Sequence, residues 1–136
     1  MGTTMIPELY WAVCTALMTA LFWVPHIAQR IVELGPYEAF RDPRHDIPTR
    51  AAWAQRAISA HTNAVENLIV FSTLAVAVAM TGTQTTMTAA AAAIYFGARL
   101  IHYGVYVAGI PWLRTPAFLT GFGCQMLLAL TILGFV

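Results

Sequence analysis

Residues 56–67 carry polar and ionisable side chains just where a long apolar run begins. These side chains belong to Arg56, His61, Asn63, Glu66 and Asn67. The apolar run continues to Met80, so this stretch is predicted to enter a membrane. An ionisable group in the hydrocarbon layer costs at least about 2.5–3.5 kcal/mol, and it is therefore rare without a partner and a function.

A second polar group surrounds Arg99, and helical geometry gives each group a face of its own. The first face consists of Arg56, Ser59, Asn63, Glu66 and Asn67, and the second of Tyr95, Arg99, His102, Tyr103 and Tyr106. At about 1.5 Å per residue, Glu66 lies roughly 20 Å from the start of its helix, and Arg99 lies roughly 15 Å from the end of the next one. The two helices are antiparallel, so we expect a buried ion pair between Glu66 and Arg99.

Two polar faces of this kind can bind a ligand or simply join helices. A Glu–Arg pair between membrane helices is often structural, and that interpretation stays open. The density of donors favours a polar ligand that bears carboxylates and enters from the cytoplasmic end. His61 and His102 have no companion at metal-ligand spacing, so no metal site is expected.

The composition is that of an integral membrane protein. Of the 136 residues, 59% are hydrophobic and 10% are charged, against about 25% charged residues in a soluble domain. A net charge of +1 without a basic run gives no indication of nucleic-acid binding. Cys14 and Cys124 lie in apolar segments and are interpreted as small buried side chains.

An all-α fold is predicted, in which a single domain over residues 1–136 crosses the membrane four times as an up-down four-helix bundle. The spans are predicted at about 6–30, 52–80, 86–108 and 115–136, with a kink at Pro25 and with Thr115 and Pro116 starting the fourth. Every Arg except Arg99 lies at or near the side of the connections 31–51 and 109–114, and the chain has no Lys. The positive-inside rule then places both connections in the cytoplasm and both termini outside or in a lumen.

Several motifs follow a common pattern. The second span contains Ala60-His61-x-Asn63-x-x-Glu66, and the third contains Ala98-Arg99-x-x-His102 followed by Tyr106. The remaining pieces are Arg30 at the end of the first span, Ala39-Phe40-x-Asp42-Pro43 in the first loop, and Arg114-x-Pro116 before the fourth span. Together these motifs resemble the MAPEG family, the membrane-associated proteins in eicosanoid and glutathione metabolism.

The resemblance implies a homotrimer that binds glutathione, as co-substrate, between adjacent subunits near the cytoplasmic face. The resemblance and the polar faces together assign its binding to Arg30, Arg56, Asn63, Glu66, Arg99, His102, Tyr103 and Tyr106. Arg30 would reach the tripeptide from the neighbouring first helix. The implied activity is that of a membrane transferase or peroxidase of the microsomal glutathione transferase type. Its thiolate would attack a lipophilic electrophile or reduce a hydroperoxide.

Two positions depart from the family pattern. Ser59 stands where eicosanoid members carry an Arg, and residues 117–121 contain no Arg that could activate the thiol. Arg114 is then the candidate for that catalytic role. The alternative function is that of a non-catalytic family member, a membrane scaffold or a partner subunit. A transporter is disfavoured, because the sequence shows neither an internal repeat nor a broken helix at the midplane.

Overall fold

The structure is a computed structural model that describes residues 5–41 and 47–136, and these residues form helices and no strand. The helices are α1 (Pro7–Leu21), α2 (Val24–Leu34), α3 (Pro36–Arg41), α4 (Ala52–Thr81), α5 (Thr86–Ala108) and α6 (Pro111–Ile132). The prediction of an all-α fold is therefore confirmed for the described residues. The predicted second and third spans correspond to α4 and α5 almost residue for residue.

Local sequence accounts for the ends of the longest helices. α4 and α5 end at Gly82 and Gly109, whose φ angles of 70° and 75° suit the left-handed cap that closes a helix. At the start of α5, Thr85 and Thr88 form a capping box in which each side chain bonds the other residue's backbone N–H. The short turn 82–85 therefore makes α4 and α5 antiparallel neighbours.

The first predicted span, residues 6–30, is divided into two helices. Residues 22–23 belong to neither α1 nor α2. Pro25 explains the interruption, because proline has no N–H to donate to the carbonyl of Leu21 and its ring clashes with that carbonyl. The kink expected at Pro25 is thus present as a break just before it. The helix after the break continues past Arg30.

The fourth helix begins earlier than predicted. α6 starts at Pro111, so Thr115 is not its N-cap and Pro116 lies inside the helix. By sequence alone either proline could start the helix, because a missing N–H in the first turn leaves no bond unmade. The chain becomes helical at the earlier proline, directly after the cap at Gly109. As a result, Arg114 lies in the first turn of α6 and not in a connecting loop.

The predicted 31–51 loop is partly helical. It contains the last turn of α2 and the whole of α3. The segment 42–46, with Asp42 and Pro43 of the motif in the first loop, lies outside the described residues. The chain then returns through 47–51 to the start of α4.

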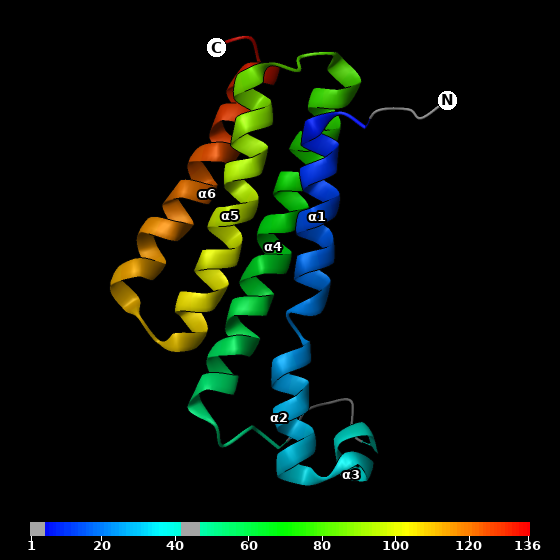
Figure 1. Cartoon of the computed structure of the whole chain (residues 1–136), viewed down its shortest axis with the longest axis vertical. Helices are drawn as coiled ribbons and strands as arrows, with labels where there is room; N and C mark the ends of the chain where they lie inside the picture. Colours follow the sequence, from blue (N-terminus) through cyan, green and yellow to red (C-terminus); the bar gives the residue numbers. More distant parts are fainter. Residues whose placement is uncertain (1–4, 42–46) are drawn as a thin grey trace.

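Helices α1, α4, α5 and α6 lie side by side (Figure 1). α5 packs against α6, and α1 and α4 pack against each other and against α5. The core between them contains the stacked rings of Phe71 and Tyr95, whose centroids are 3.8 Å apart, together with Val78 and Leu128. Cys124 is also in this core, and both cysteines are free thiols.

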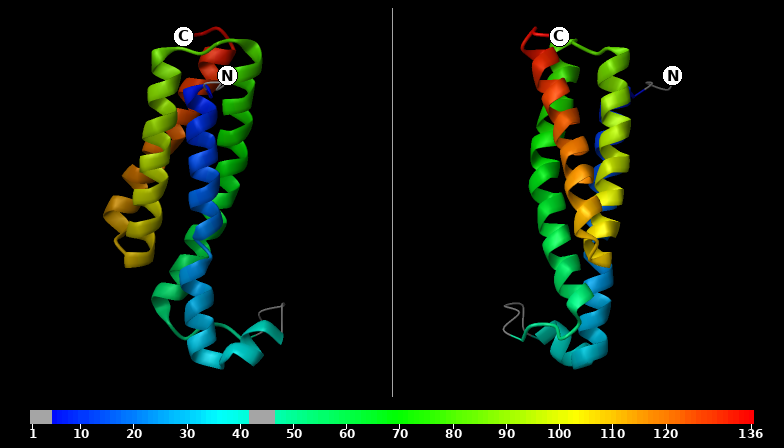
Figure 2. Two further views of the ribbon diagram at one scale, coloured as in Figure 1. Left: turned by 45° about the vertical axis from the view of Figure 1, so that its right-hand side comes forward. Right: turned by 90° about the vertical axis from the view of Figure 1, so that its left-hand side faces the viewer.

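At one end of the molecule, some helices extend further than α5 and α6. α2, α3 and the first turns of α4 reach past the turn that joins α5 to α6 (Figures 1 and 2). α4 has 30 residues and α5 has 23, which makes α4 about 10 Å longer at 1.5 Å per residue. Because the two helices meet at the 82–85 turn, the extra length lies at the opposite end, which carries Arg41, Arg50, Arg56 and Arg114.

Three helical stretches are long and apolar enough to cross a membrane: Pro7–Leu34, Ala52–Thr81 and Pro111–Ile132. Four spans were predicted, and α5 is not among these three although it has 23 residues. Arg99 and His102 lower its mean hydropathy.

Candidate functional site

Arg99 and Asn63 form the best-defined polar contact between the two predicted faces. Arg99 lies on α5 and is only 2% exposed. Its Nη2 donates a hydrogen bond to the Oδ1 of Asn63 on α4 at 2.6 Å. Its Nε is buried and has no hydrogen-bond partner in the described part of the chain. Arg99 is thus a buried cation that bonds one neutral acceptor, Asn63, and its Nε donor is unused.

The expected ion pair between Glu66 and Arg99 is absent. Within residues 5–41 and 47–136, no carboxylate oxygen of Glu66 lies within 4.0 Å of the Arg99 guanidinium. Glu66 is exposed on the surface of α4, whereas Asn63 is half-buried and faces α5. The two residues are one helical turn apart, so the prediction chose the right face of α4 but the wrong turn.

His102 lies one turn below Arg99 and is also buried. Its ring meets those of Tyr106, at 5.6 Å between centroids, and Phe118, at 6.0 Å. Its Nδ1 has no hydrogen-bond partner among the described residues. Phe118 belongs to the stretch 117–121 of α6, which contains no Arg.

Two arginines border a small cavity at the charged end of α4, α5 and α6. Arg56, Tyr106 and Arg114 line it together with the turn at Gly109, and its volume is about 240 Å³. The Nε of Arg56 donates to the carbonyl oxygen of Val107 at 2.9 Å. The guanidinium carbon of Arg114 lies 4.8 Å from the centre of the Tyr106 ring, a cation–π contact. We call this space, which Arg56, Tyr106 and Arg114 line, the arginine cavity.

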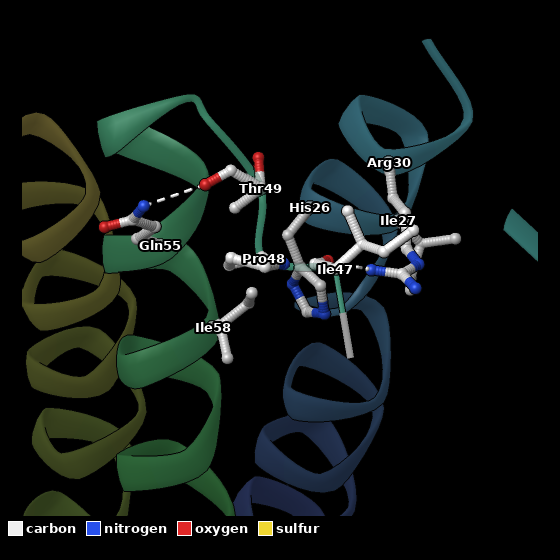
Figure 3. Close-up of a pocket in the computed structure, with 8 residues that line it drawn as sticks. All are labelled: His26, Ile27, Arg30, Ile47, Pro48, Thr49, Gln55 and Ile58. Carbon is white, nitrogen blue, oxygen red and sulfur yellow. Dashed lines mark hydrogen bonds between the residues drawn. The ribbon is translucent and has the colours of Figure 1, made fainter. Parts of the chain in front are cut away.

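Arg30 lies in a different place. It is 8% exposed on α2, and its Nη1 donates to the carbonyl oxygen of Ile47 at 2.9 Å. Figure 3 shows a separate cavity here, between α2, the segment 47–49 and the start of α4. Tyr103 is also apart from the other predicted residues. Its hydroxyl donates to the carbonyl oxygen of Phe22 at 2.9 Å, and the two rings stack at 3.8 Å.

A comparison with known families bears on what these residues are for. One family model, described as the MAPEG family, matches residues 9–134 of the chain. The chain belongs to the MAPEG family. Searches of curated proteins and of solved structures found no match. Membership of MAPEG, together with the three apolar helices, makes the chain an integral membrane protein.

Some polar contacts in this MAPEG chain were not predicted. Gln125 on α6 is buried, and its Nε2 donates to the backbone oxygen of Asn67 at 3.1 Å and to the Tyr95 hydroxyl at 3.4 Å. Glu8 on α1 is fully buried, and its Oε1 accepts a hydrogen bond from the Thr88 hydroxyl at the start of α5. Each is a polar residue surrounded by apolar neighbours in its helix, and the sequence could have indicated a buried polar contact from that pattern.

Histidines provide little for a metal. His26 and His61 come together across α2 and α4, with ring centroids 5.8 Å apart. Among the described residues, no group of three or more His, Cys, Asp or Glu side chains gathers at one place.

Proposed function

We propose that this MAPEG protein is a glutathione-dependent membrane transferase or peroxidase that acts on lipophilic electrophiles or hydroperoxides. The observation that carries the proposal is Arg99, a buried cation at membrane depth whose Nε lacks a partner in the described part of the chain. A cation is seldom kept in the hydrocarbon layer without a function. The MAPEG family includes glutathione transferases and peroxidases as well as non-catalytic members.

Glutathione carries two carboxylates, an amino group and a thiol, and the chain offers a complement to each charge. The arginine cavity at the membrane surface receives one carboxylate through Arg56, because charge-assisted hydrogen bonds to arginine suit planar carboxylates. The second carboxylate or a peptide carbonyl reaches the free donor of Arg99. Arg30 and Tyr103 lie apart from this set within the described chain, Arg30 against Ile47 and Tyr103 against Phe22.

Glu66 supports assembly as a homotrimer. Its carboxylate is exposed on α4 about five residues, or roughly 7 Å, inside the hydrocarbon layer when a 30 Å layer is measured from Thr81. The exposed hydroxyls of Thr62 and Thr73 on the same helix each bond the carbonyl four residues before them, whereas the Glu66 carboxylate has no such bond among the described residues. An ionisable side chain at that depth needs a partner or cover, and copies of α4 in a trimer of four-span subunits provide it. Glu66 then meets the amino group of glutathione at the subunit boundary.

Arg114 is the residue that stabilises the thiolate form of glutathione. A nearby cation favours the charged form of a thiol, and the thiolate is the nucleophile. Its place in the first turn of α6 brings it nearer to the site than a loop position. In conjugation, the sulfur forms a bond to the electrophilic carbon and the leaving group departs with its electron pair. The positive-inside rule puts the arginine cavity, with the connections 31–51 and 109–114, in the cytoplasm.

A second candidate function is that of a non-catalytic scaffold or partner subunit. The stretch 117–121 favours it, because it contains no Arg that could activate the thiol, and its Phe118 lies against the His102 ring. A chain of this kind would bind glutathione weakly, or bind it without turnover.

Thermal melting of the protein in mild detergent, with and without millimolar glutathione, tests the proposal. Binding at one hundred times Kd stabilises the folded state by about 2.7 kcal/mol, so the melting temperature should rise. Arg99→Gln should weaken binding about tenfold or more, since it removes a charged hydrogen-bond donor. Arg41→Gln is the matched control, because Arg41 lies on α3 at the same end and pairs with Glu38 across the surface.

Turnover separates the two functions. The transferase should conjugate a generic aromatic electrophile at a rate that increases with pH as the thiolate forms. Binding without turnover would favour the scaffold. No glutathione-dependent stabilisation in the wild type would reject the glutathione site.

A further inference from the structure

Helix α6 meets both of the helices that carry the predicted polar faces. It packs against α5 and against α4, and α4 and α5 pack against each other. Two buried residues of α6, Gly121 and Gln125, lie one helical turn apart on the side of α6 that faces these neighbours. Neither was among the predicted site residues, and both lie close to residues of the candidate site.

Gly121 is in contact with Arg99. A Cβ atom added to Gly121 would lie 3.5 Å from the Cδ of Arg99 and 3.6 Å from the ring of Tyr95. The aliphatic part of the Arg99 side chain therefore lies directly over the backbone of α6, in space that a large side chain at position 121 would fill. Because α6 lies behind it, the guanidinium extends toward α4, where its Nη2 bonds the Oδ1 of Asn63 at 2.6 Å.

Gln125 fixes the position of α6 against the other two helices. Its side chain is 3% exposed, and its Nε2 donates to the Tyr95 hydroxyl on α5 at 3.4 Å and to the backbone oxygen of Asn67 on α4 at 3.1 Å. On all three helices these bonds lie one turn, or four residues, from the contact at Gly121. Sliding or rotating α6 would break both bonds, so they keep Gly121 beside Arg99.

A second glycine of α6 shows what is particular about position 121. Glycine is the least favourable residue after proline in the interior of a helix, so its presence there calls for a reason. Gly123 is exposed, and a Cβ added to it would have nothing within 4 Å. Position 121 is therefore the one of these two positions at which the side chain decides what the neighbouring helix can hold.

We propose that Gly121 and Gln125 are positioning residues for Arg99. Gly121 leaves the room that the Arg99 side chain needs, and Gln125 holds α6 where that room lies beside Arg99. Both act through Arg99, and a larger side chain at position 121 moves the guanidinium away from Asn63. The expected effect on glutathione rests on the function proposed above, in which Arg99 binds the tripeptide, whereas the effect on the bond between Arg99 and Asn63 does not.

Titration with glutathione, followed by thermal melting, tests the effect on the site. Gly121→Leu should weaken binding about tenfold, which is the loss expected from Arg99→Gln. The double variant should bind no more weakly than Arg99→Gln alone, and a general loss of packing would not produce this result. Gln125→Met removes both bonds at similar size and should weaken binding in the same direction.

Two variants are the controls for this titration. Gly121→Ala should keep the wild-type affinity, because its Cβ lies at an ordinary contact distance, and it should melt at a higher temperature, because alanine favours a helix. Gly123→Leu should bind like the wild type, since it makes the same change on the exposed side of α6. If Gly121→Leu does not fold, the smaller Gly121→Val replaces it.

Equilibrium unfolding in mixed micelles provides a measurement that needs no ligand. The coupling between Asn63→Leu and Arg99→Leu should disappear in the Gly121→Leu background and persist in the Gly123→Leu background. If the wild type binds no glutathione, the proposed function fails and this coupling alone decides whether Gly121 positions Arg99. Equal coupling in the two backgrounds would overturn the proposal. So would wild-type affinity for glutathione in Gly121→Leu, or an unchanged affinity in Gln125→Met.

Discussion

The contact between Arg99 and Asn63 predicts a measurable coupling between two helices. Asn63→Leu removes the acceptor that the structure places 2.6 Å from Nη2 and leaves the guanidinium, 2% exposed, without it. Hydrogen bonds to charged groups contribute about 1.5–3 kcal/mol, so the free energy of unfolding should fall by about that amount. Arg99→Leu removes the charge itself. The double variant should therefore lose less than the sum of the single losses, with a coupling of at least about 1 kcal/mol.

Equilibrium unfolding in mixed micelles, followed by circular dichroism, measures all four corners of this cycle. Asn67→Leu is the matched control, because Asn67 is also half-buried on α4 but its side chain donates to the backbone oxygen of Asn63, within its own helix. That control should add independently to Arg99→Leu. A coupling below about 0.5 kcal/mol for Asn63, or one equal to that of Asn67, would refute the assignment of the bond.

Two further predictions concern the helix ends. Gly109→Ala adds a Cβ 3.1 Å from the Arg56 guanidinium at a φ of +75°, so it should weaken glutathione binding as well as stability. Gly82→Ala, at a φ of +70° with nothing within 4 Å of the added Cβ, should lower stability alone, by about 1 kcal/mol. Titration of both variants with glutathione separates the effects, and equal affinities would contradict the role given to Arg56. Tyr103→Phe keeps the ring stacked on Phe22 but removes the bond to its carbonyl, so unfolding in detergent should show a loss of about 0.5–1.5 kcal/mol, and an unchanged stability would show that the bond contributes nothing.

Most of the helical framework could be predicted because its limits are local. The apolar runs of α4 and α5 are bounded by Gly82 and Gly109, and both limits agree with the predicted spans. The start of α6 could not be predicted with equal success, since Pro111 and Pro116 both fit a first turn. That choice depends on how the chain leaves α5, which is a matter of three-dimensional packing.

The partner of Arg99 shows a different limit of sequence reasoning. Depth estimates from two helices are uncertain by about one turn, or about 5.4 Å. Asn63 and Glu66 are separated by roughly that distance on the same face of α4. Charge favoured Glu66, but the half-buried position is that of Asn63. The MAPEG motif contains both residues, and it does not indicate which of them faces α5 within one subunit.

The bond between Glu8 and Thr88 joins residues that are 80 positions apart in the chain. The ribosome adds about 5–20 residues each second, so roughly 4–16 s separate the synthesis of these two partners. During that interval Glu8 is an unpaired acid in the first turn of a membrane helix, and water near the headgroups is its available partner. The buried position of Glu8 therefore depends on α5, a helix that is synthesised later.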